Sequence, residues 1–303
     1  MAKNTIAVMG ATGHIGHVLT EELLKKGHKV RALGRDARKL QDLKAKGAET
    51  FSGDFTDSAL LSRVFKGCNA IFSFTPPAME ADDIEVYRDR AGEAIAHAVA
   101  KANVTHVLNL SSMGASEPIG TGLIKELHRQ EERLNAISNL HLLHFRPNYF
   151  MENLLQSLPA VRSSGAIVSA LHANHAIPMV ATHDIALKIA DFMSSLKFSG
   201  TSIFEFVGPQ AITMTEATKV IGKAIGKPDL KYAQHTYAQV EKELIASGMR
   251  HQLAKLMVEM QRAFNEEKVA PTQQLTADHK GKTTIEEFAK VFAQLYRSAK
   301  KAA

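Results

Sequence analysis

Short apolar runs alternate with longer amphipathic segments through the first half of the chain. The apolar runs predict strands at Thr5–Met9, Lys29–Leu33, Glu49–Phe51, Ala70–Phe74, His106–Leu110 and Leu140–Phe145. The segments between them repeat apolar residues at helical spacing and predict helices at Ile15–Lys26, Ala37–Lys46, Ser58–Phe65, Asp83–Ala102 and Gly122–Ile137. Strands that alternate with helices imply right-handed crossovers and a parallel sheet covered on both faces. We therefore expect an α/β, Rossmann-like, doubly wound fold.

The pattern changes after about residue 150, where prolines such as Pro159, Pro178 and Pro209 divide the chain into short pieces. Ile203–Val207 predicts one further strand, and Tyr237–Glu266 and Thr284–Ser298 predict helices. We expect residues 1–150, with a returning strand near 203–207, to form a Rossmann-like NAD(P)-binding domain. Residues 151–303 should form a smaller α/β lobe on the substrate side, intertwined with the first domain.

The composition is that of a soluble globular protein, with 45% hydrophobic and 22% charged residues among 303. The net charge is +6 and the pI about 9.2, but the basic residues are dispersed along the sequence. Dispersed charge gives no support for a nucleic-acid partner. A mildly basic surface instead suits an anionic small molecule, such as a cofactor that carries phosphates.

Cys68 is the only cysteine, so no disulfide can form within the chain and no cysteine–histidine metal site is expected. We interpret it as a small apolar core residue. The N-terminal sequence enters a strand at once, without the basic and apolar regions of a signal peptide. No apolar run is long enough to cross a bilayer. These features predict a cytoplasmic location, with no membrane partner.

Three glycines follow the first predicted strand, in the stretch IAVMGATGHIG that ends at Gly16. Gly10 permits a tight turn, Gly13 lets the backbone approach a pyrophosphate, and Gly16 lets the helix pack closely on the strand. The N–H groups that open the helix then face the phosphates. We expect Thr12, His14 and Ile15 to contact the cofactor as well. For His14, a solvent-facing position in the loop is an equally good interpretation.

The end of the second strand indicates the type of dinucleotide. A carboxylate there usually binds the ribose hydroxyls of NAD, but this chain has Arg35 at that place, with Arg31 and Lys39 nearby. A guanidinium suits the 2′-phosphate of NADP through two charge-assisted hydrogen bonds. Asp36 either binds a ribose or caps the following helix, and we favour the cap. NADP(H) is therefore the preferred cofactor, with NAD(H) possible.

Two other strand ends carry candidate cofactor contacts. Asp54, with Phe55 beside it, follows the third strand and can accept a hydrogen bond from the adenine amino group. Thr75, Pro76 and Pro77 form a stiff turn after the fourth strand, suited to lining the nicotinamide ribose. Ordinary loop chemistry explains each stretch equally well.

The stretches GATGHIG, RALGRDARKL, GDFTDSALL, FTPP, NLSSMGA and HFRPNYFMENLL resemble the NmrA-like branch of the atypical short-chain dehydrogenases/reductases. They cover the first half of the chain in the family's order. The resemblance implies one of two activities. Some members are NAD(P)H-dependent reductases of quinones, dyes or phenylpropanoid-type compounds, and others bind the dinucleotide and report its redox state to a partner.

The catalytic pair of the superfamily is missing from its usual place. Most members carry Tyr-x-x-x-Lys on the helix after the fifth strand, whereas Tyr296 and Lys300 of this chain lie in the C-terminal tail. The helix in the expected place carries His128 and Glu132, one turn apart. This pair resembles the His-x-x-x-Glu of quinone- and dye-reducing members. Three roles for His128 stay open: proton donor, positioning group, or surface residue without a role in catalysis.

The resemblance also places two segments beside the nicotinamide. Ser111 and Ser112 end the fifth strand, where a hydroxyl either contacts ribose or substrate or caps the local backbone. After the sixth strand, Asn148 and Phe150 are expected to contribute to an apolar wall near the nicotinamide, together with Tyr149 and Met151. Part of that segment also suits a hinge, because Pro147 requires an extended chain before it.

These observations favour an NADPH-dependent reductase that transfers hydride to a quinone-like or aromatic acceptor. Such acceptors need less proton assistance than a ketone, so the missing tyrosine does not exclude this activity. The alternative is a redox sensor with the same cofactor site and weak turnover. A sugar-nucleotide epimerase is disfavoured, because that chemistry relies on the missing pair. A homodimer is compatible with the sequence.

Overall fold

The computed structural model describes residues 3–298 and contains a main sheet of seven strands in the order β3-β2-β1-β4-β5-β6-β8. Parallel registers join β1 to β2 and β4, β2 to β3, and β5 to β4 and β6. The strand order reverses between β1 and β4, which is the switch point of a doubly wound sheet. The strands are β1 (Thr5–Met9), β2 (Lys29–Gly34), β3 (Glu49–Ser52), β4 (Ala70–Phe74), β5 (His106–Leu110), β6 (His141–Pro147) and β8 (Thr201–Phe206).

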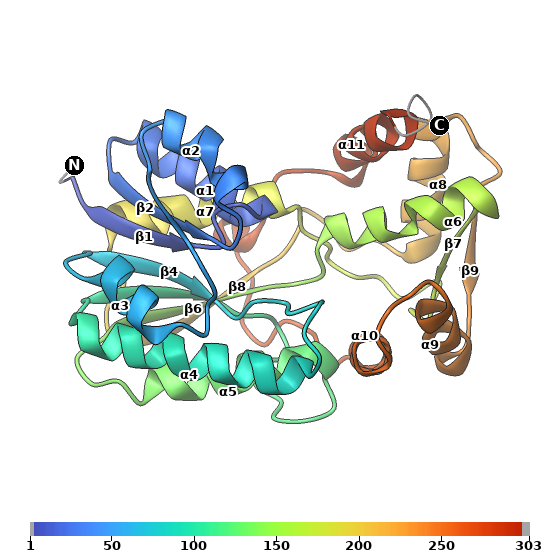
Figure 1. Ribbon diagram of the computed structural model, residues 1–303. Helices are drawn as coiled ribbons and strands as arrows, with labels where there is room; N and C mark the ends of the chain where they lie inside the picture. Colours follow the sequence, from blue (N-terminus) through green and yellow to red (C-terminus); the bar gives the residue numbers. More distant parts are fainter. Residues whose placement is uncertain (1–2, 299–303) are drawn as a thin grey trace. The chain divides into compact units, whose positions relative to one another are not determined.

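Helices cover both faces of this sheet, which confirms the predicted fold class. Figure 1 shows α1, α2 and α7 on one face and α3, α4 and α5 on the other. These helices are α1 (His14–Lys25), α2 (Gln41–Ala45), α3 (Ser58–Phe65), α4 (Ile84–Ala102), α5 (Lys125–Asn135) and α7 (Thr182–Ser195). Two single-turn segments precede α2 and α5, namely η1 (Ala37–Leu40) and η2 (Gly122–Ile124).

Aspartates fix where several helices begin. The Asp57 carboxylate accepts the backbone N–H groups of Ala59 and Leu60, and Asp83 caps α4 in the same way. Such caps satisfy N–H groups that the first turn of a helix leaves without partners. They explain why the helices start close to the residues that the sequence predicts.

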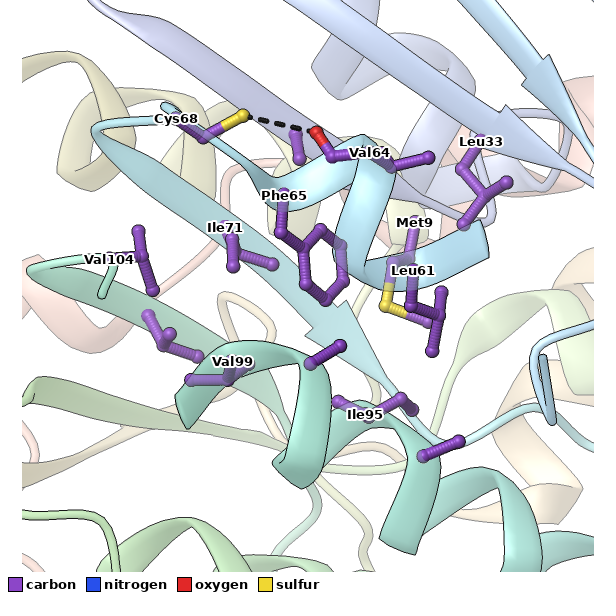
Figure 2. Packing of buried hydrophobic residues seen from close by; sticks show 14 of the residues in the cluster. Met9, Leu33, Leu61, Val64, Phe65, Cys68, Ile71, Ile95, Val99 and Val104 are labelled. Atoms are coloured by element: carbon purple, nitrogen blue, oxygen red, sulfur yellow. Dashed lines mark hydrogen bonds between the residues drawn. The ribbon is translucent and has the colours of Figure 1, made fainter. Parts of the chain in front are cut away.

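A continuous apolar core lies between the sheet and helices α3 and α4. Figure 2 shows Phe65 and Leu61 of α3 packed toward Ile71 of β4 and Ile95 of α4. Cys68 belongs to this cluster, and its thiol contacts the carbonyl oxygen of Val64 at 3.4 Å. Burial raises the pKa of the Cys68 thiol, so the residue is an unreactive core residue, as the sequence predicts.

The chain forms two compact units. The first comprises the chain up to Pro118, then Ile124–Arg146 and Ile185–Phe204. The second comprises Ile119–Leu123, Pro147–Asp184 and the chain from Glu205 onward. Most of α7 therefore belongs to the first unit, together with most of the returning strand β8.

The second unit contains a small parallel sheet of β7 (Ala166–Ser169) and β9 (Lys231–Gln234). Its helical elements are η3 (Met151–Ser157), α6 (Leu158–Ser163), α8 (Met214–Ile225), α9 (Tyr237–Ala246), α10 (His251–Asn265), η4 (Ala277–His279) and α11 (Ile285–Ser298). The sequence pattern identified α11 but not α8 or the small sheet.

The prediction of one continuous helix over Tyr237–Glu266 is wrong. The segment forms two helices, because Gly248 adopts a left-handed φ of +94° after α9 ends. The N–H groups of Gly248 and Met249 donate to the carbonyl oxygens of Ile245 and Leu244, which closes the helix end. Apolar residues continue at helical spacing across the break, so periodicity alone does not reveal it.

Candidate functional site

Gly10 and Gly16 are required by the packing of the first loop. Gly10 follows β1 with a φ of +63°, and a Cβ on it would lie 2.4 Å from the ring of Phe74. A Cβ on Gly16 would lie 2.2 Å from the carbonyl oxygen of Gly10. Both distances are far inside van der Waals contact, so any side chain at either position would displace α1 or the end of β4.

Gly13 is different, because the chain itself leaves room for a side chain there. Its φ is −88°, and a Cβ would meet only the Gly10 carbonyl oxygen, at an ordinary 3.4 Å. Gly13 is also the N-cap of α1, with no side chain bonded to the N–H groups of the first turn and no acidic residue there. Exposed backbone, unpaired N–H groups and a helix dipole together form a cradle for an anion. A pyrophosphate fits this cradle, and a side chain on Gly13 would fill it.

The remaining loop residues divide between solvent and core. His14 is exposed, whereas Ile15 is buried, so Ile15 offers a ligand its backbone N–H only. The methyl group of Thr12 packs against Gly34 of β2. A Cβ added to Gly34 would lie only 3.0 Å from that methyl group. The Ala11 N–H donates to the Leu33 carbonyl oxygen at 3.0 Å, which fixes the loop to the end of β2.

Of the cations near β2, Arg31 is held by hydrogen bonds to other residues of the first unit. Its guanidinium donates to the Glu49 carboxylate at 3.0 Å and to the carbonyl oxygens of Val64 and Lys66 at 2.8 and 2.7 Å. Arg31 is near Arg35 in the sequence, but these hydrogen bonds leave its guanidinium unavailable to a 2′-phosphate. Closeness in sequence to Arg35 does not place the two side chains together, because that of Arg31 projects toward the α3–β4 connection.

Arg35 and Lys39 are the cations that remain for a phosphate. Asp36 accepts the N–H of Arg38 at 2.9 Å and its guanidinium at 3.0 Å, which confirms the helix-cap interpretation of Asp36. The hydrogen bonds from Arg38 lower the pKa of Asp36. Arg35 and Lys39 are exposed, and no hydrogen bond or ion pair within residues 3–298 involves either side chain.

Asp54 is held as an ionised acceptor at the end of β3. Its Oδ1 accepts the N–H and hydroxyl of Thr56 at 2.8 and 2.7 Å, and its Oδ2 accepts the hydroxyl of Tyr87 at 2.9 Å. Burial alone would raise the pKa of Asp54, but these hydrogen bonds and the charge of Arg35 lower it. Phe55 beside it is buried and meets Phe74 edge-on, with ring centroids 5.8 Å apart.

Tyr87 is a site residue that the sequence reasoning missed. It lies on α4, far along the chain from Asp54, and no motif links the two residues. Burial and the neighbouring Asp54 carboxylate raise the pKa of Tyr87 to about 12, so it donates its hydrogen to Asp54 at neutral pH. The only signal in the sequence is an aromatic residue in the first turn of a helix that begins near the sheet's switch point.

The end of β4 carries a buried hydroxyl without a partner. The Thr75 Oγ1 atom makes no hydrogen bond to any residue between 3 and 298, and Thr75 is 6% exposed. Pro76 after it is buried, whereas Pro77 is exposed. A buried polar atom without a partner is unfavourable, so Thr75 is suited to bind a group brought by a ligand. The observation fits a nicotinamide ribose at the switch point.

Ser111 is tied into a buried ion pair. Its hydroxyl donates to Glu131 Oε1 at 2.5 Å, and Glu131 also accepts Nε and Nη2 of Arg146 at 2.9 and 2.5 Å. Because an ionised carboxylate only accepts hydrogen bonds, the hydrogen of Ser111 points at Glu131. Ser111 therefore has only its lone pairs to offer a cofactor. Ser112, the next residue, is partly exposed.

The position of His128 defines which of its nitrogens can exchange a proton. Its Nδ1 lies 2.8 Å from the carbonyl oxygen of Ala115, which only accepts, so Nδ1 carries a hydrogen. Its Nε2 lies 3.6 Å from Glu132 Oε1. The side chain is 21% exposed. Nε2 can therefore receive a proton from solvent and pass it on.

Asn148 and Phe150 belong to the second unit, whereas the residues described so far belong to the first. The Asn148 side chain is buried, and its Oδ1 accepts the N–H of Tyr149 at 2.7 Å. Phe150 is partly exposed and pairs with Val180 in an isolated bridge. The other predicted residues lie in the first unit, and the cofactor contacts of all of them remain predictions.

A cluster on the outer surface of α1 and α2 has the ligand types of a metal site, namely His17, Glu21 and Asp42. The ammonium group of Lys46 already bonds Glu21 at 2.5 Å and Asp42 at 2.6 Å, so both carboxylates have a cationic partner within the protein. Between residues 3 and 298, no helix is long and apolar enough to span a membrane.

Comparison with known proteins identifies the family and its named activities. The model of the NmrA-like family matches residues 2–289. A (4-alkanoyl-5-oxo-2,5-dihydrofuran-3-yl)methyl phosphate reductase of Streptomyces griseus is 31% identical over 74% of this chain and 74% of its own length. An NAD(P)H azoreductase of Xenophilus azovorans is 26% identical over 97% of this chain and its full length.

Quinone oxidoreductase 2 of Escherichia coli is 25% identical over 84% of this chain and 86% of its own length. A solved structure of the E. coli quinone oxidoreductase QOR2 with NADPH has a TM-score of 0.80, at 22% identity over 94% of this chain and 99% of that chain. This structural likeness supports the fold described above.

Proposed function

The chain belongs to the NmrA-like family, and from that premise we propose that it is an NADPH-dependent oxidoreductase acting on a quinone-like or aromatic acceptor. The observation that supports the cofactor most directly is Gly13, where nothing inside the protein forbids a side chain and the helix N-terminus is left open. The three relatives described above are named for reductions, and two of the names specify an azo compound or a quinone as the type of substrate.

We assign the adenine half of the cofactor to the ends of β1, β2 and β3. The glycine loop and the first N–H groups of α1 bind the pyrophosphate, and Arg35 with Lys39 binds the 2′-phosphate. Asp54, oriented by Tyr87, accepts the adenine amino group. Asp54 is fixed by hydrogen bonds before a ligand arrives, whereas the exposed side chains of Arg35 and Lys39 become ordered on binding.

We assign the nicotinamide half to the ends of β4 and β5. Thr75 supplies a buried hydroxyl without a partner, and Ser111 supplies an acceptor. When bound, NADPH supplies a hydride from its nicotinamide ring. His128 then holds a proton on Nε2 for the reduced acceptor, while the bond from Nδ1 to Ala115 keeps the ring oriented.

The absence of a Tyr-x-x-x-Lys pair in α5 fits this choice of acceptor. A quinone becomes aromatic as it accepts hydride, so orientation and exclusion of water supply most of the acceleration. A ketone would need a strong proton donor in the transition state. Tyr296 lies in the second unit with Arg162 and Lys227 near its ring, and Lys300 lies outside the described residues.

The direct test is to measure binding and turnover on the same preparation. Calorimetry should show tight binding of NADPH, and a panel of quinones and azo dyes should accelerate its oxidation. Tight binding without turnover on any acceptor would instead support a redox sensor. Failure to bind NADPH or NADH would contradict both functions.

The cellular location and the oligomeric state of the protein are also proposals. We place the protein in the cytoplasm, because the reducing NADPH pool and a lone buried thiol suit that compartment. Sedimentation of the purified protein will test whether it forms the homodimer that the sequence allows.

A further inference from the structure

Helix α5 is anchored by polar contacts rather than by an apolar face. Four of its residues are buried, namely Glu126, Gln130, Glu131 and Leu134, and only the last is apolar. A helix of this kind is usually held by a continuous apolar stripe, which α5 does not have. The polar contacts must therefore determine where along the sheet this helix sits.

Two of those contacts connect α5 to the sheet at successive levels. At the lower level, Asn135 Oδ1 bonds Nε2 of His144 at 3.0 Å, and the His144 ring contacts Asn109 of β5 at 3.3 Å. At the upper level, Glu131 bonds Arg146 through two hydrogen bonds and accepts the Ser111 hydroxyl.

The two levels are in register. His144 pairs with Asn109 across β5 and β6, and Arg146 and Ser111 each lie two residues further along their strands on the same face. Glu131 precedes Asn135 by four residues, which is about one helical turn. The crossover helix runs antiparallel to the strands, so its earlier residues lie toward the strands' carboxyl ends.

His128 lies on the same side of α5 as Asn135 and Glu131, one further turn toward the start of the helix. It lies three residues before Glu131, about 4.5 Å further along the helix axis and on the same side of α5. Ser111 already follows the last residue of β5, so His128 is placed beyond the end of that strand. Ligands bind at this edge of a parallel sheet.

A buried ion pair is better suited to positioning this helix than to stabilising the fold. Removing two charges from water offsets most of their attraction, so replacing such a pair by apolar residues is often neutral for stability. A bidentate guanidinium–carboxylate pair instead fixes both the distance and the angle between its two partners. Apolar side chains at these positions would allow α5 to slide.

We propose that Glu131 and Arg146 are positioning residues that set the height of α5 on the sheet and thereby the location of His128 Nε2 in the site. This inference rests on the proposed function, because it assigns His128 to proton delivery. Neither Glu131 nor Arg146 contacts the reacting atoms. The Ser111 hydroxyl is fixed by the same pair as a secondary consequence.

The test compares two arginines that each pair with a buried glutamate of α5. Arg146→Lys keeps the positive charge beside Glu131 but loses the bidentate geometry. Arg129→Lys is the matched control, because Arg129 lies one residue from His128, is 50% exposed and bonds Glu126 through a single guanidinium nitrogen at 3.1 Å, a contact that an ammonium group can replace. We expect Arg146→Lys to lower kcat for quinone reduction about tenfold or more, with the Kd for NADPH changed less than about twofold, whereas Arg129→Lys changes neither.

The coupling to His128 separates positioning from a merely structural role. His128→Gln should lower kcat by a similar factor, and adding Arg146→Lys to it should lower kcat no further. In the wild type, the nitrogen NMR spectrum of the His128 ring should show hydrogen on Nδ1 in the neutral form. In Arg146→Lys, a smaller fraction of the neutral rings should carry the hydrogen on Nδ1.

Three results would overturn the inference while leaving the proposed function intact. One is a fall in melting temperature for Arg146→Lys with kcat unchanged. Another is a loss of kcat that is as large in the His128→Gln background as in the wild type. The third is a wild-type kcat in His128→Gln. If the wild-type protein neither binds NADPH nor oxidises it, the proposed function itself fails.

Discussion

The glycine loop after β1 and the sheet-facing side of α5 form two parts of one candidate site, and they are built differently. In the loop, the backbone is the candidate binding surface, and side chains are excluded at Gly16 and Gly10, where a Cβ would lie 2.2 and 2.4 Å from its neighbours. Under α5, buried side chains form their part of the candidate site, through hydrogen bonds of Glu131 to Arg146 and Ser111. The loop is built to receive charge, whereas the α5 contacts neutralise charge internally.

This difference separates binding from chemistry. A backbone cradle accepts any dinucleotide with a pyrophosphate, so it gives affinity with little dependence on the acceptor. The fixed carboxylate under α5 determines the direction in which Ser111 and His128 can act. We therefore expect changes in the loop to affect affinity and changes under α5 to affect stability and kcat.

The largest effect should come from leaving one buried charge without its partner. Glu131→Ala leaves the Arg146 guanidinium, 6% exposed, without a carboxylate. We expect a loss of about 3–5 kcal/mol in the free energy of unfolding, measured by urea denaturation. Glu132→Ala is the control, because that carboxylate is 66% exposed and should change stability by less than about 0.5 kcal/mol. Equal losses for both variants would contradict a special role for the buried pair.

Two glycines of the loop should separate affinity from folding. Gly13→Ala should preserve the melting temperature but weaken NADPH by about 1.5–3 kcal/mol, because a phosphate loses a charge-assisted contact. Gly16→Ala should lower the melting temperature, since its Cβ would lie 2.2 Å from the Gly10 carbonyl oxygen. Calorimetry and thermal unfolding measure both quantities. If Gly13→Ala destabilises the fold as much as Gly16→Ala, Gly13 is needed for packing and the cradle argument fails.

The choice between NADPH and NADH should depend on one arginine of the β2 end. Arg35→Ala should weaken NADPH by about 1–3 kcal/mol and NADH much less, through loss of the 2′-phosphate contact. Arg38→Ala is the matched control, because the Arg38 guanidinium is already paired with Asp36 at 3.0 Å. Equal weakening of NADPH and NADH by Arg35→Ala would show that Arg35 is not at the 2′-phosphate.

The smallest expected effect is on the pH dependence of stability. Burial lowers the pKa of His144 below its ordinary value of 6.5, so the folded protein favours the neutral ring. The stabilising contribution is therefore complete above about pH 6.5 and is lost as the pH falls below that value. His144→Gln should flatten the decline in unfolding free energy between neutral and mildly acidic pH. An unchanged decline in this variant would assign the effect to other groups, such as His106 or His28, whose pKa values burial also lowers.

The sequence predicted the sheet and the loop because both depend on local rules. Apolar runs at regular spacing identified the strands, and the glycine spacing identified the cradle, since backbone conformation and close approach restrict the residue type. Asp36 was identified as a cap for the same local reason.

Contacts between distant segments could not be predicted in this way. Arg31 is near Arg35 in the sequence, but the fold brings the carbonyl oxygens of Val64 and Lys66 within reach of its guanidinium. Tyr87 and Glu131 acquire their roles only when α4 and α5 pack on the sheet, and no spacing in the sequence encodes those pairs. The break at Gly248 was missed because apolar periodicity continues across it.

The central claim is that an uncovered backbone at the start of α1 binds the phosphates of a nicotinamide dinucleotide. Calorimetric titration of the wild-type protein with NADPH and with NADH tests it most directly. The structure predicts binding of both, with NADPH the tighter ligand because Arg35 and Lys39 are free to meet its extra phosphate. Folded protein that binds neither dinucleotide would contradict the claim.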